Sequence, residues 1–311
     1  MNDQSPLRAG GSLLERAADL YGFGLGTPPS APHEVTQPAA PAAVAPAAPA
    51  APLRTPAPEP RPAPAAATVS ARVAGRGGKI DPEALARGGF IAPDAPGSAL
   101  AEEFRIVKRQ LLRNLAGSDD KARNILVCSA LPNEGKTFCA INLALSLAAE
   151  KDVEVLLIDA DFPKPEVLAL LGLEAGPGLT DALADPDADP ESFVVRTDLR
   201  GLSLLPAGRP VGDVTELLAS ERTRRLLARL ADPRRIILFD SPPALMASPA
   251  TVLASHVGQL LMVVRADQTS EADLREAVGL LSACDQIRLL LNGTGFAVNG
   301  RRFGSYYGYG Q

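Results

Sequence analysis

Residues 130–137, ALPNEGKT, have the types and spacing of a phosphate-binding loop, with Ala130 in place of the usual first glycine. In such a loop the backbone N–H groups surround the phosphates, a lysine lies against the β and γ oxygens, and a hydroxyl binds Mg2+. Asn133 stands where many such loops have glycine, and asparagine enters the left-handed backbone region more readily than most residues. We expect nucleotide binding by Pro132, Asn133, Glu134, Gly135, Lys136, Thr137, Phe138 and Asn292.

Three aspartates end apolar segments that are predicted to be buried strands. Asp159 and Asp161 belong to LLIDAD, and Asp240 ends IILFD. A single aspartate in such a place is often a turn or cap residue, but three beside a phosphate-binding loop favour chemistry. Carboxylates next to a triphosphate form a hard-oxygen site for Mg2+, and one that the metal does not fully use can accept a proton from an incoming hydroxyl. We expect metal-binding or catalytic roles for all three.

These residues must be positioned by a regular alternation of apolar runs and amphipathic helices. Short apolar runs separated by helices are typical of a parallel sheet that is buried on both faces. We therefore predict a doubly wound α/β domain with a mostly parallel sheet, and ligands at the carboxyl ends of its strands. The runs lie at 124–130, 153–161, 235–243, 259–267 and 287–293, and the helices at 98–115, 135–150, 215–231, 248–256 and 270–284.

The N-terminal part of the chain has a different composition, because 16 of the 29 prolines lie between Pro28 and Pro96 in an alanine-dominated stretch. Such a stretch buries too little apolar surface to offset the entropy of ordering. We predict a short amphipathic helix region at 1–26, a disordered Pro/Ala-rich linker at 27–96, a folded P-loop domain at 97–298 and a flexible tyrosine-rich tail at 299–311. The N-terminal helix either frays or docks on a partner.

Charge and hydropathy exclude several classes of protein. The formal net charge of −5 argues against nucleic-acid binding, which requires a basic face. No segment approaches the roughly 20 apolar residues that cross a bilayer, and the N-terminus lacks the order of a signal peptide, so we expect a cytoplasmic protein. Three cysteines without a CxxC spacing (Cys128, Cys139 and Cys284) are expected to be core residues.

The C-terminus, RRFGSYYGYGQ, holds three of the four tyrosines of the chain: Tyr306, Tyr307 and Tyr309. A tyrosine hydroxyl has a pKa near 10, so its phosphorylation requires positioning and a proton acceptor, for which Asp161 is the candidate. The glycine-rich GTGFAVNGRRFG before it is expected to be a flexible tether, which from Asn292 to Tyr306 spans at most about 46–50 Å. Without the phosphate-binding loop, this tail would be interpreted as an unordered end.

The order SALPNEGKT, LLIDADFPKP and IILFDSPP, followed by a tyrosine-rich C-terminus, resembles the kinases of the bacterial tyrosine kinase (BY-kinase) family, the exopolysaccharide tyrosine autokinases. The resemblance covers residues 102–292 and the tail. It implies ATP and Mg2+, with Lys136 and Thr137 ending the Walker A motif, Asp159 and Asp161 as the Walker A′ aspartates, and Asp240 as the Walker B aspartate. The implied catalytic residues are Lys136, Asp161 and Asp159, and the implied metal ligands are Thr137, Asp159 and Asp240.

The segment EEFRIVKRQLLRN is similar to the Glu-x-x-Arg-x-x-Arg helix that packs one subunit of this family against the next in a ring. The matching residues are Glu102, Arg105 and Lys108, the last in place of the usual arginine, which alone pairs in a bidentate manner. The segments SLLERAADL and FRIVKRQLL look closest to kinases encoded with exosortase-type systems. The resemblance also implies a separate membrane chain-length-determinant protein as activator, and a kinase that is peripheral at the inner membrane.

We therefore expect an autokinase that phosphorylates its tyrosine cluster in trans between subunits and regulates exopolysaccharide polymerisation and export. Two other classes stay open: a MinD/ParA-like positioning ATPase without protein kinase activity, and a scaffold switched by nucleotide. The loop of the MinD type carries a further lysine five residues before the P-loop lysine, and Leu131 occupies that position here. This difference and the tyrosine tail disfavour the positioning ATPase.

Overall fold

The computed structural model describes residues 76–93, 97–115 and 120–293. The predicted N-terminal helix, most of the predicted linker and the tyrosines of the tail lie outside these residues. The described part holds no helix that is both long and apolar enough to span a membrane.

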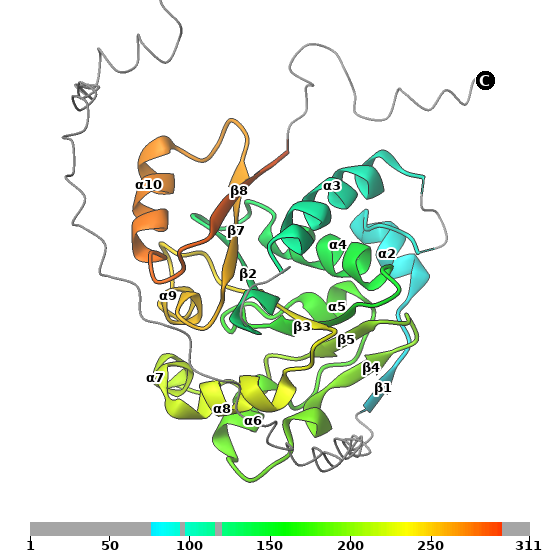
Figure 1. Ribbon diagram of the computed structural model, residues 1–311, viewed down its shortest axis with the longest axis vertical. Helices are drawn as coiled ribbons and strands as arrows, with labels where there is room; N and C mark the ends of the chain where they lie inside the picture. Colours follow the sequence, from blue (N-terminus) through cyan, green and yellow to red (C-terminus); the bar gives the residue numbers. More distant parts are fainter. Residues whose placement is uncertain (1–75, 94–96, 116–119, 294–311) are drawn as a thin grey trace, which may run out of the picture. The chain divides into compact units, whose positions relative to one another are not determined.

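A mostly parallel sheet runs through the described residues (Figure 1). Neighbouring strands pair in parallel except β4 and β5, which are antiparallel. The predicted fold class is confirmed, and the five predicted strands are β2, β3, β6, β7 and β8. In sheet order the strands are β1 (Arg76–Gly78), β4 (Val195–Thr197), β5 (Leu202–Leu205), β3 (Glu154–Asp159), β6 (Arg235–Asp240), β2 (Asn124–Ser129), β7 (Gln259–Arg265) and β8 (Ile287–Asn292).

Helices cover both faces of this sheet, which explains why its central strands are continuous apolar runs (Figure 1). Ile125 and Val127 of β2 face a core shared with α3 and α4, while Leu126 and Cys128 face a second core shared with α9 and α10. The α-helices are α2 (Pro82–Gly88), α3 (Ala99–Arg113), α4 (Lys136–Ala148), α5 (Val167–Leu170), α6 (Leu179–Ala184), α7 (Val214–Ala219), α8 (Glu221–Leu230), α9 (Pro249–Ala254) and α10 (Glu271–Leu280).

One predicted helix forms two helices in the structure, α7 and α8. Residues 215–231 divide at Ser220, whose backbone is extended (ψ 161°) and whose hydroxyl donates to the carbonyl of Leu217 (2.6 Å) and accepts from the N–H of Arg222 (3.3 Å). A serine that satisfies backbone groups in this way competes with the helix and caps the next one. The periodicity of the sequence missed this break because the apolar face continues across it.

The predicted linker at 27–96 extends too far, because residues 76–93 belong to the folded body. Helix α2 begins with Pro82 after an Asp81 cap and ends before Gly89, which has a left-handed φ of +66°. The N–H of Asp81 donates to the carbonyl of Leu171 (3.1 Å), and the N–H of Ile91 donates to the side chain of Asn142 (2.8 Å). These partners are distant in sequence, so composition alone could not show that this segment is folded.

The substitution Leu85→Ala tests this boundary. Leu85 is buried in the first core, so we expect the free energy of unfolding to fall by about 2–5 kcal/mol in urea titrations. The same change at the exposed Leu280 is the control and should stay within about 0.5 kcal/mol of the wild type. Equal, small effects of the two substitutions would show that α2 is not part of the cooperative unit.

Candidate active site

The loop between β2 and α4 has the backbone of a phosphate-binding loop. Gly135 has a φ of +95°, and Asn133, with a φ of +64°, adopts the left-handed conformation that the sequence predicted for it. A Cβ atom on Gly135 would lie 2.1 Å from the side-chain nitrogen of Asn292, so a larger residue cannot replace this glycine without moving Asn292. The left-handed residues Asn133 and Gly135, together with the nearby side chain of Asn292, therefore constrain the backbone of the loop where it enters α4.

Two contacts from the far end of the chain brace this loop. The amide of Asn292 donates to the backbone carbonyl of Glu134 (2.8 Å), and the buried carboxylate of Glu134 accepts from the N–H of Leu131 (2.9 Å) and from the hydroxyl of Thr269. Thr269 also accepts from the N–H of Arg265 (2.8 Å). The side chains of Glu134 and Asn292, predicted to bind nucleotide, thus hold the loop. Thr269 was missed because a threonine in the β7–α10 turn carries no motif.

The P-loop lysine and the second aspartate of LLIDAD meet directly. Lys136 Nζ lies 2.7 Å from Asp161 Oδ2, and the two side chains are 13% and 5% exposed. Burial would lower the pKa of Lys136, but its hydrogen bond to Asp161 and the charge of Asp240 raise that pKa overall. Lys136 is therefore an ammonium ion inside a pocket of carboxylates.

The other two aspartates are neighbours across the sheet, since Asp159 pairs with Asp240 in the register of β3 and β6. The carboxylate of Asp159 accepts from the N–H groups of Asp161 (3.3 Å) and Val167 (3.1 Å), so it also fixes the loop after β3. Burial raises the pKa of Asp159 to about 7 and that of Asp240 to about 8, although nearby Lys136 lowers both. Each carboxylate consequently holds a proton more tightly than in water.

One oxygen in this cluster, Asp240 Oδ1, is buried and has no hydrogen-bond partner. Such an atom is costly unless a ligand uses it. Thr137 donates to the Asp240 carboxylate and supplies a second hard oxygen. Mg2+ is commonly held by one or two carboxylates together with substrate phosphates. Thr137 and Asp240, with Asp159 beside them, are the residues that would hold it.

Phe138 and Lys108 have internal contacts that the sequence did not predict. The ring of Phe138 stacks on Phe90, with centroids 5.6 Å apart, so it faces the segment after α2. The ammonium of Lys108 is buried, donates to the carbonyl of Ser146 (2.7 Å) and pairs with Glu150 (2.8 Å), and this hydrogen bond lowers the pKa of Glu150. Lys108 thus stabilises the C-terminal end of α4, where a cation is favoured, and is not presented to a neighbouring subunit as predicted.

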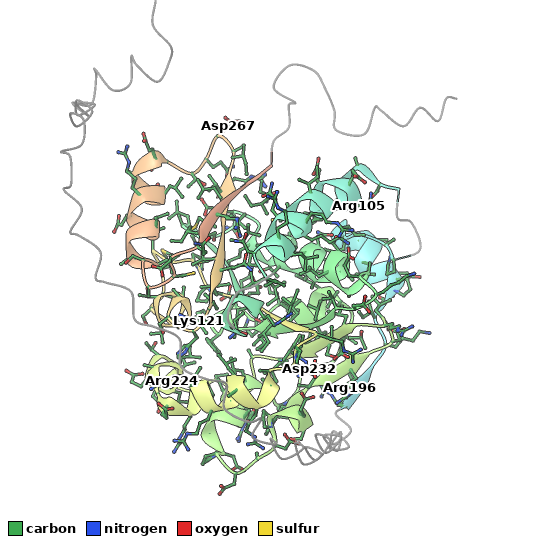
Figure 2. All side chains as sticks on the ribbon, viewed as in Figure 1. Arg105, Lys121, Arg196, Arg224, Asp232 and Asp267 are labelled. Carbon is green, nitrogen blue, oxygen red and sulfur yellow. The ribbon has the colours of Figure 1, made fainter. Side chains whose placement is uncertain are left out.

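Glu102 and Arg105 lie at the surface of α3, where they form an ion pair with each other, and Figure 2 labels Arg105 on this helix. Glu102 and Arg105 are thus the two surface residues of the three predicted at a subunit interface, and the interface stays a prediction.

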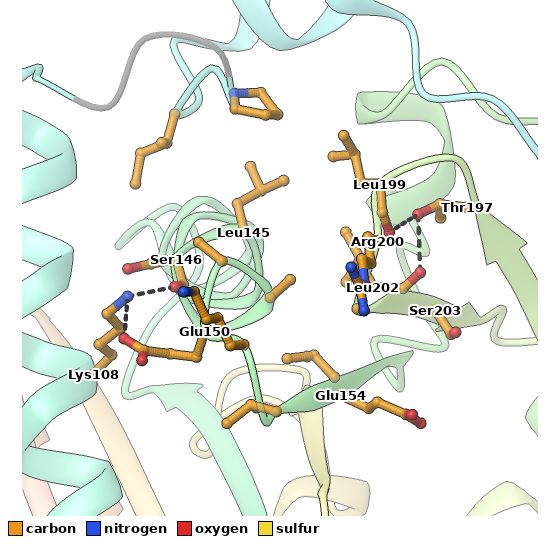
Figure 3. Close-up of a pocket in the computed structure, with 18 of the residues that line it drawn as sticks. Lys108, Leu145, Ser146, Glu150, Glu154, Thr197, Leu199, Arg200, Leu202 and Ser203 are labelled. Carbon is orange, nitrogen blue, oxygen red and sulfur yellow. Dashed lines mark hydrogen bonds and ion pairs between the residues drawn. The ribbon is translucent and has the colours of Figure 1, made fainter.

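A cavity of about 920 Å3, shown in Figure 3, lies away from the P-loop and the three aspartates. Its lining includes Val153 before β3, Gly201 before β5 and Arg234 before β6, so it opens at the amino ends of the parallel strands. The P-loop and the aspartates lie at the carboxyl ends, where ligands of such sheets bind. The chemistry of the side chains, and not the size of this cavity, therefore locates the nucleotide site.

No known family model matches the chain. It is 29% identical over 220 residues to the tyrosine-protein kinase YwqD of Bacillus subtilis, which covers 71% of this chain and 89% of that protein. It is 33% identical over 188 residues to the tyrosine-protein kinase wzc of Salmonella typhimurium, which covers 60% of this chain and 26% of that protein. The solved VpsO kinase domain is 32% identical, covers 61% of this chain and 95% of that domain, and has a TM-score of 0.52.

The chain belongs to the bacterial tyrosine kinase family. The kinase domain of Escherichia coli tyrosine kinase ETK is 26% identical, with a TM-score of 0.55 over 65% of this chain and 77% of that one. The bacterial tyrosine kinases differ in length, since the chain spans most of YwqD but about a quarter of wzc. The placement in the exosortase-associated subfamily stays a prediction.

The raised pKa values predict how stability depends on pH in the absence of nucleotide and Mg2+. In the unfolded chain these aspartates lose their protons near pH 4, whereas in the folded protein Asp159 and Asp240 do so near pH 7 and 8. Their contribution to stability is therefore complete below about pH 4 and is lost as the pH rises through about 7 and 8. The urea midpoint in EDTA should therefore fall between about pH 4 and pH 8, with no further loss from these two groups above that range, and it should fall less steeply in Asp240→Asn.

The control for this measurement is Asp187→Asn, at an exposed position away from the site, which should keep the wild-type slope. An Asp240→Asn protein that loses stability as steeply as the wild type would contradict the assigned burial of this carboxyl.

Proposed function

We propose that this chain is an ATP- and Mg2+-dependent protein tyrosine autokinase whose phosphoacceptors are Tyr306, Tyr307 and Tyr309. The observation that carries the proposal is the 2.7 Å contact between Lys136 and Asp161. It joins the cation that would bind the transferred phosphate to the carboxylate that would take the proton of the acceptor. A carboxylate in this place also serves an ATPase, where it takes a proton from the attacking water, so it is the relationship to tyrosine kinases and the tyrosine-rich tail that favour the autokinase.

The contact also suggests how the site is kept from acting without nucleotide. While Lys136 pairs with Asp161, the carboxylate oxygen Oδ2 is engaged by the ammonium. When ATP binds, the phosphates compete for Lys136, and Asp161 becomes free to accept a hydrogen bond from a tyrosine hydroxyl. Binding of ATP thus frees Asp161 to accept the proton of the tyrosine.

The chemical step follows from these positions. The tyrosine oxygen forms a bond to the γ-phosphorus, the bond from that phosphorus to the β,γ-bridging oxygen breaks, and ADP leaves with the electron pair. The hydroxyl proton passes to Asp161. Lys136 and the N–H groups at the start of α4 stabilise the negative charge on the phosphates. Mg2+ bound by Thr137 and Asp240, with Asp159 beside them, would neutralise further phosphate charge.

We also propose that the transfer occurs between subunits of a homo-oligomer, with a ring as the expected form. The tether from Asn292 to Tyr306 reaches at most about 46–50 Å, which permits delivery to a neighbouring molecule. Glu102 and Arg105, exposed on α3, are the proposed contact residues. Family membership supports two further proposals: a role in exopolysaccharide polymerisation and export, and a separate membrane chain-length-determinant protein as activator that recruits this kinase to the inner membrane.

Asp161→Asn separates chemistry from nucleotide binding. It removes the proton acceptor but preserves the shape of the side chain, so phosphate incorporation into the C-terminal peptide should fall by about 10²–10⁴-fold. ATP binding, measured by calorimetry with Mg2+, should persist. Tandem mass spectrometry of the C-terminal peptide after incubation with ATP and Mg2+ gives the phosphorylation directly.

The chain offers a matched control for the acceptors. A protein with Phe at positions 306, 307 and 309 should lose phosphotyrosine, whereas Tyr21→Phe, the remaining tyrosine of the chain, should label like the wild type. ATP hydrolysis by a wild-type protein that never accumulates phosphotyrosine would instead favour the positioning ATPase. Nucleotide-dependent assembly with neither activity would favour the scaffold.

A further inference from the structure

Strand β8 has an open edge. It is the last strand in the order of the sheet and pairs with β7 alone among the described strands. The carbonyl of Gln286 accepts from Leu260 (2.9 Å) and that of Asn292 accepts from Ala266 (2.8 Å). Alternate residues of a strand direct their backbone groups to opposite sides, so the even-numbered residues face β7. The N–H and C=O groups of Leu289 and Leu291 therefore face the open edge.

This edge is also apolar. Leu289 and Leu291 are 59% and 58% exposed, and they lie on one face of the strand because they are two residues apart. The residues between and before them turn to the other face, where Leu290 packs on the first core and Arg288 donates to Gln259 (2.7 Å). An unpaired edge with exposed leucines is a template for one more strand.

The sequence that follows supplies a matching strand. Gly293 has a left-handed φ of +70°, and the residues after it are Thr294, Gly295, Phe296, Ala297 and Val298. The carbonyl of Asn292 already accepts a hydrogen bond from β7. Leu291 is therefore the last residue of β8 whose backbone groups can pair with a following strand. A four-residue loop of 292–295, a common hairpin length, places Phe296 opposite Leu291 and Val298 opposite Leu289. We propose that residues 296–298 pair antiparallel with β8 and cover its two exposed leucines.

The covalent connection favours this occupant over a second molecule. The chain continues for 18 residues after Gly293, directly from the strand whose edge is open. A segment tethered by four residues has an effective concentration in the millimolar range, above that of another copy of the protein in solution. Both predicted pairs join two apolar side chains on one face, which is the arrangement that stabilises antiparallel strands.

The pairing would control how far the tyrosines reach, a consequence that depends on the proposed function. With residues 296–298 bound, the free tether begins at Val298, beside Leu289, and Tyr306 is eight residues away. Tyr306 then reaches at most about 26–29 Å from Val298, which lies beside Leu289 and thus before the carboxyl end of β8. Without the pairing it reaches about 46–50 Å from Asn292. Release of this strand would lengthen the reach of the acceptor without any change at the P-loop.

A cysteine pair tests the register in nucleotide-free protein. The three native cysteines of the chain are buried, so they can stay in place. Directly opposite residues have Cα atoms about 5.5 Å apart, which permits a disulfide. Leu289→Cys/Val298→Cys should oxidise within one chain, protecting both thiols from alkylation. The control Leu289→Cys/Ala297→Cys has the second thiol on the other face and should oxidise at least about tenfold more slowly.

Hydrogen exchange gives a second readout. The amides of Leu289 and Leu291 should exchange about tenfold or more slowly in the wild type than in Phe296→Asp, which places a charge against Leu291. The matched control, Phe303→Asp, changes a tail phenylalanine beyond the paired segment and should keep the wild-type protection. Because no ATP is present, neither measurement depends on the kinase proposal. If that proposal also holds, Phe296→Asp should speed initial phosphorylation of the tail at least about twofold.

Three results would overturn the pairing. Unprotected amides at Leu289 and Leu291 in the wild type would show that the edge is open. Equal oxidation of the two cysteine pairs would exclude the register. Disulfides formed only between chains, or protection that rises with protein concentration, would assign the edge to a second copy of the protein.

Discussion

The carboxyl ends of β2, β6 and β3 meet because these strands pair in parallel, with Val127 opposite Asp240 and Asp240 opposite Asp159. Every chemical group of the site is attached to this edge. The P-loop leaves β2, and Asp161 follows β3 by two residues. A shift of one residue in either pairing would turn the aspartate side chains to the opposite face of the sheet and separate them from Lys136. The register of three apolar strands is therefore the constraint on which the chemistry depends.

The site concentrates charge where water is scarce. Asp159, Asp161 and Asp240 are almost fully buried, and Lys136 is the cation that the structure places in contact with this group. One cation cannot balance three carboxylates, and burial raises the pKa of two of them, Asp159 and Asp240. An arrangement of this kind is poised to exchange protons for a divalent cation. The unfavourable burial of these carboxylates is the physical counterpart of the proposed binding of Mg2+ and nucleotide at this site.

Much of the fold follows from local sequence. The strands at 124–130, 153–161 and 235–243 were predictable because a parallel sheet needs continuous apolar runs, and the left-handed Asn133 because few other residues tolerate that conformation. Contacts between distant residues were not predictable in this way. Lys108 sits in a helix with a charged flank, and its burial depends on the end of α4, nearly 40 residues later.

The same limit applies to residues 76–93 and to Thr269. Helix α2 lies in a stretch rich in Pro, Ala and Gly, and it is folded because Leu171 and Asn142 receive its flanking backbone groups. Thr269 is a turn residue until the fold brings it against Glu134. In each case the local sequence permits several conformations, and the tertiary partner selects one.

The bracing of the P-loop by Asn292 has a consequence for how the protein is made. The two residues joined by this hydrogen bond are 158 positions apart, and Asn292 ends the last strand of the described sheet. A ribosome synthesises the loop long before it synthesises its brace. A nascent chain that lacks β8 therefore has the residues of an ATP site without the contact that shapes them. Maturation of the nucleotide site is thus tied to completion of the domain, because a truncated product lacks the contact that braces the P-loop.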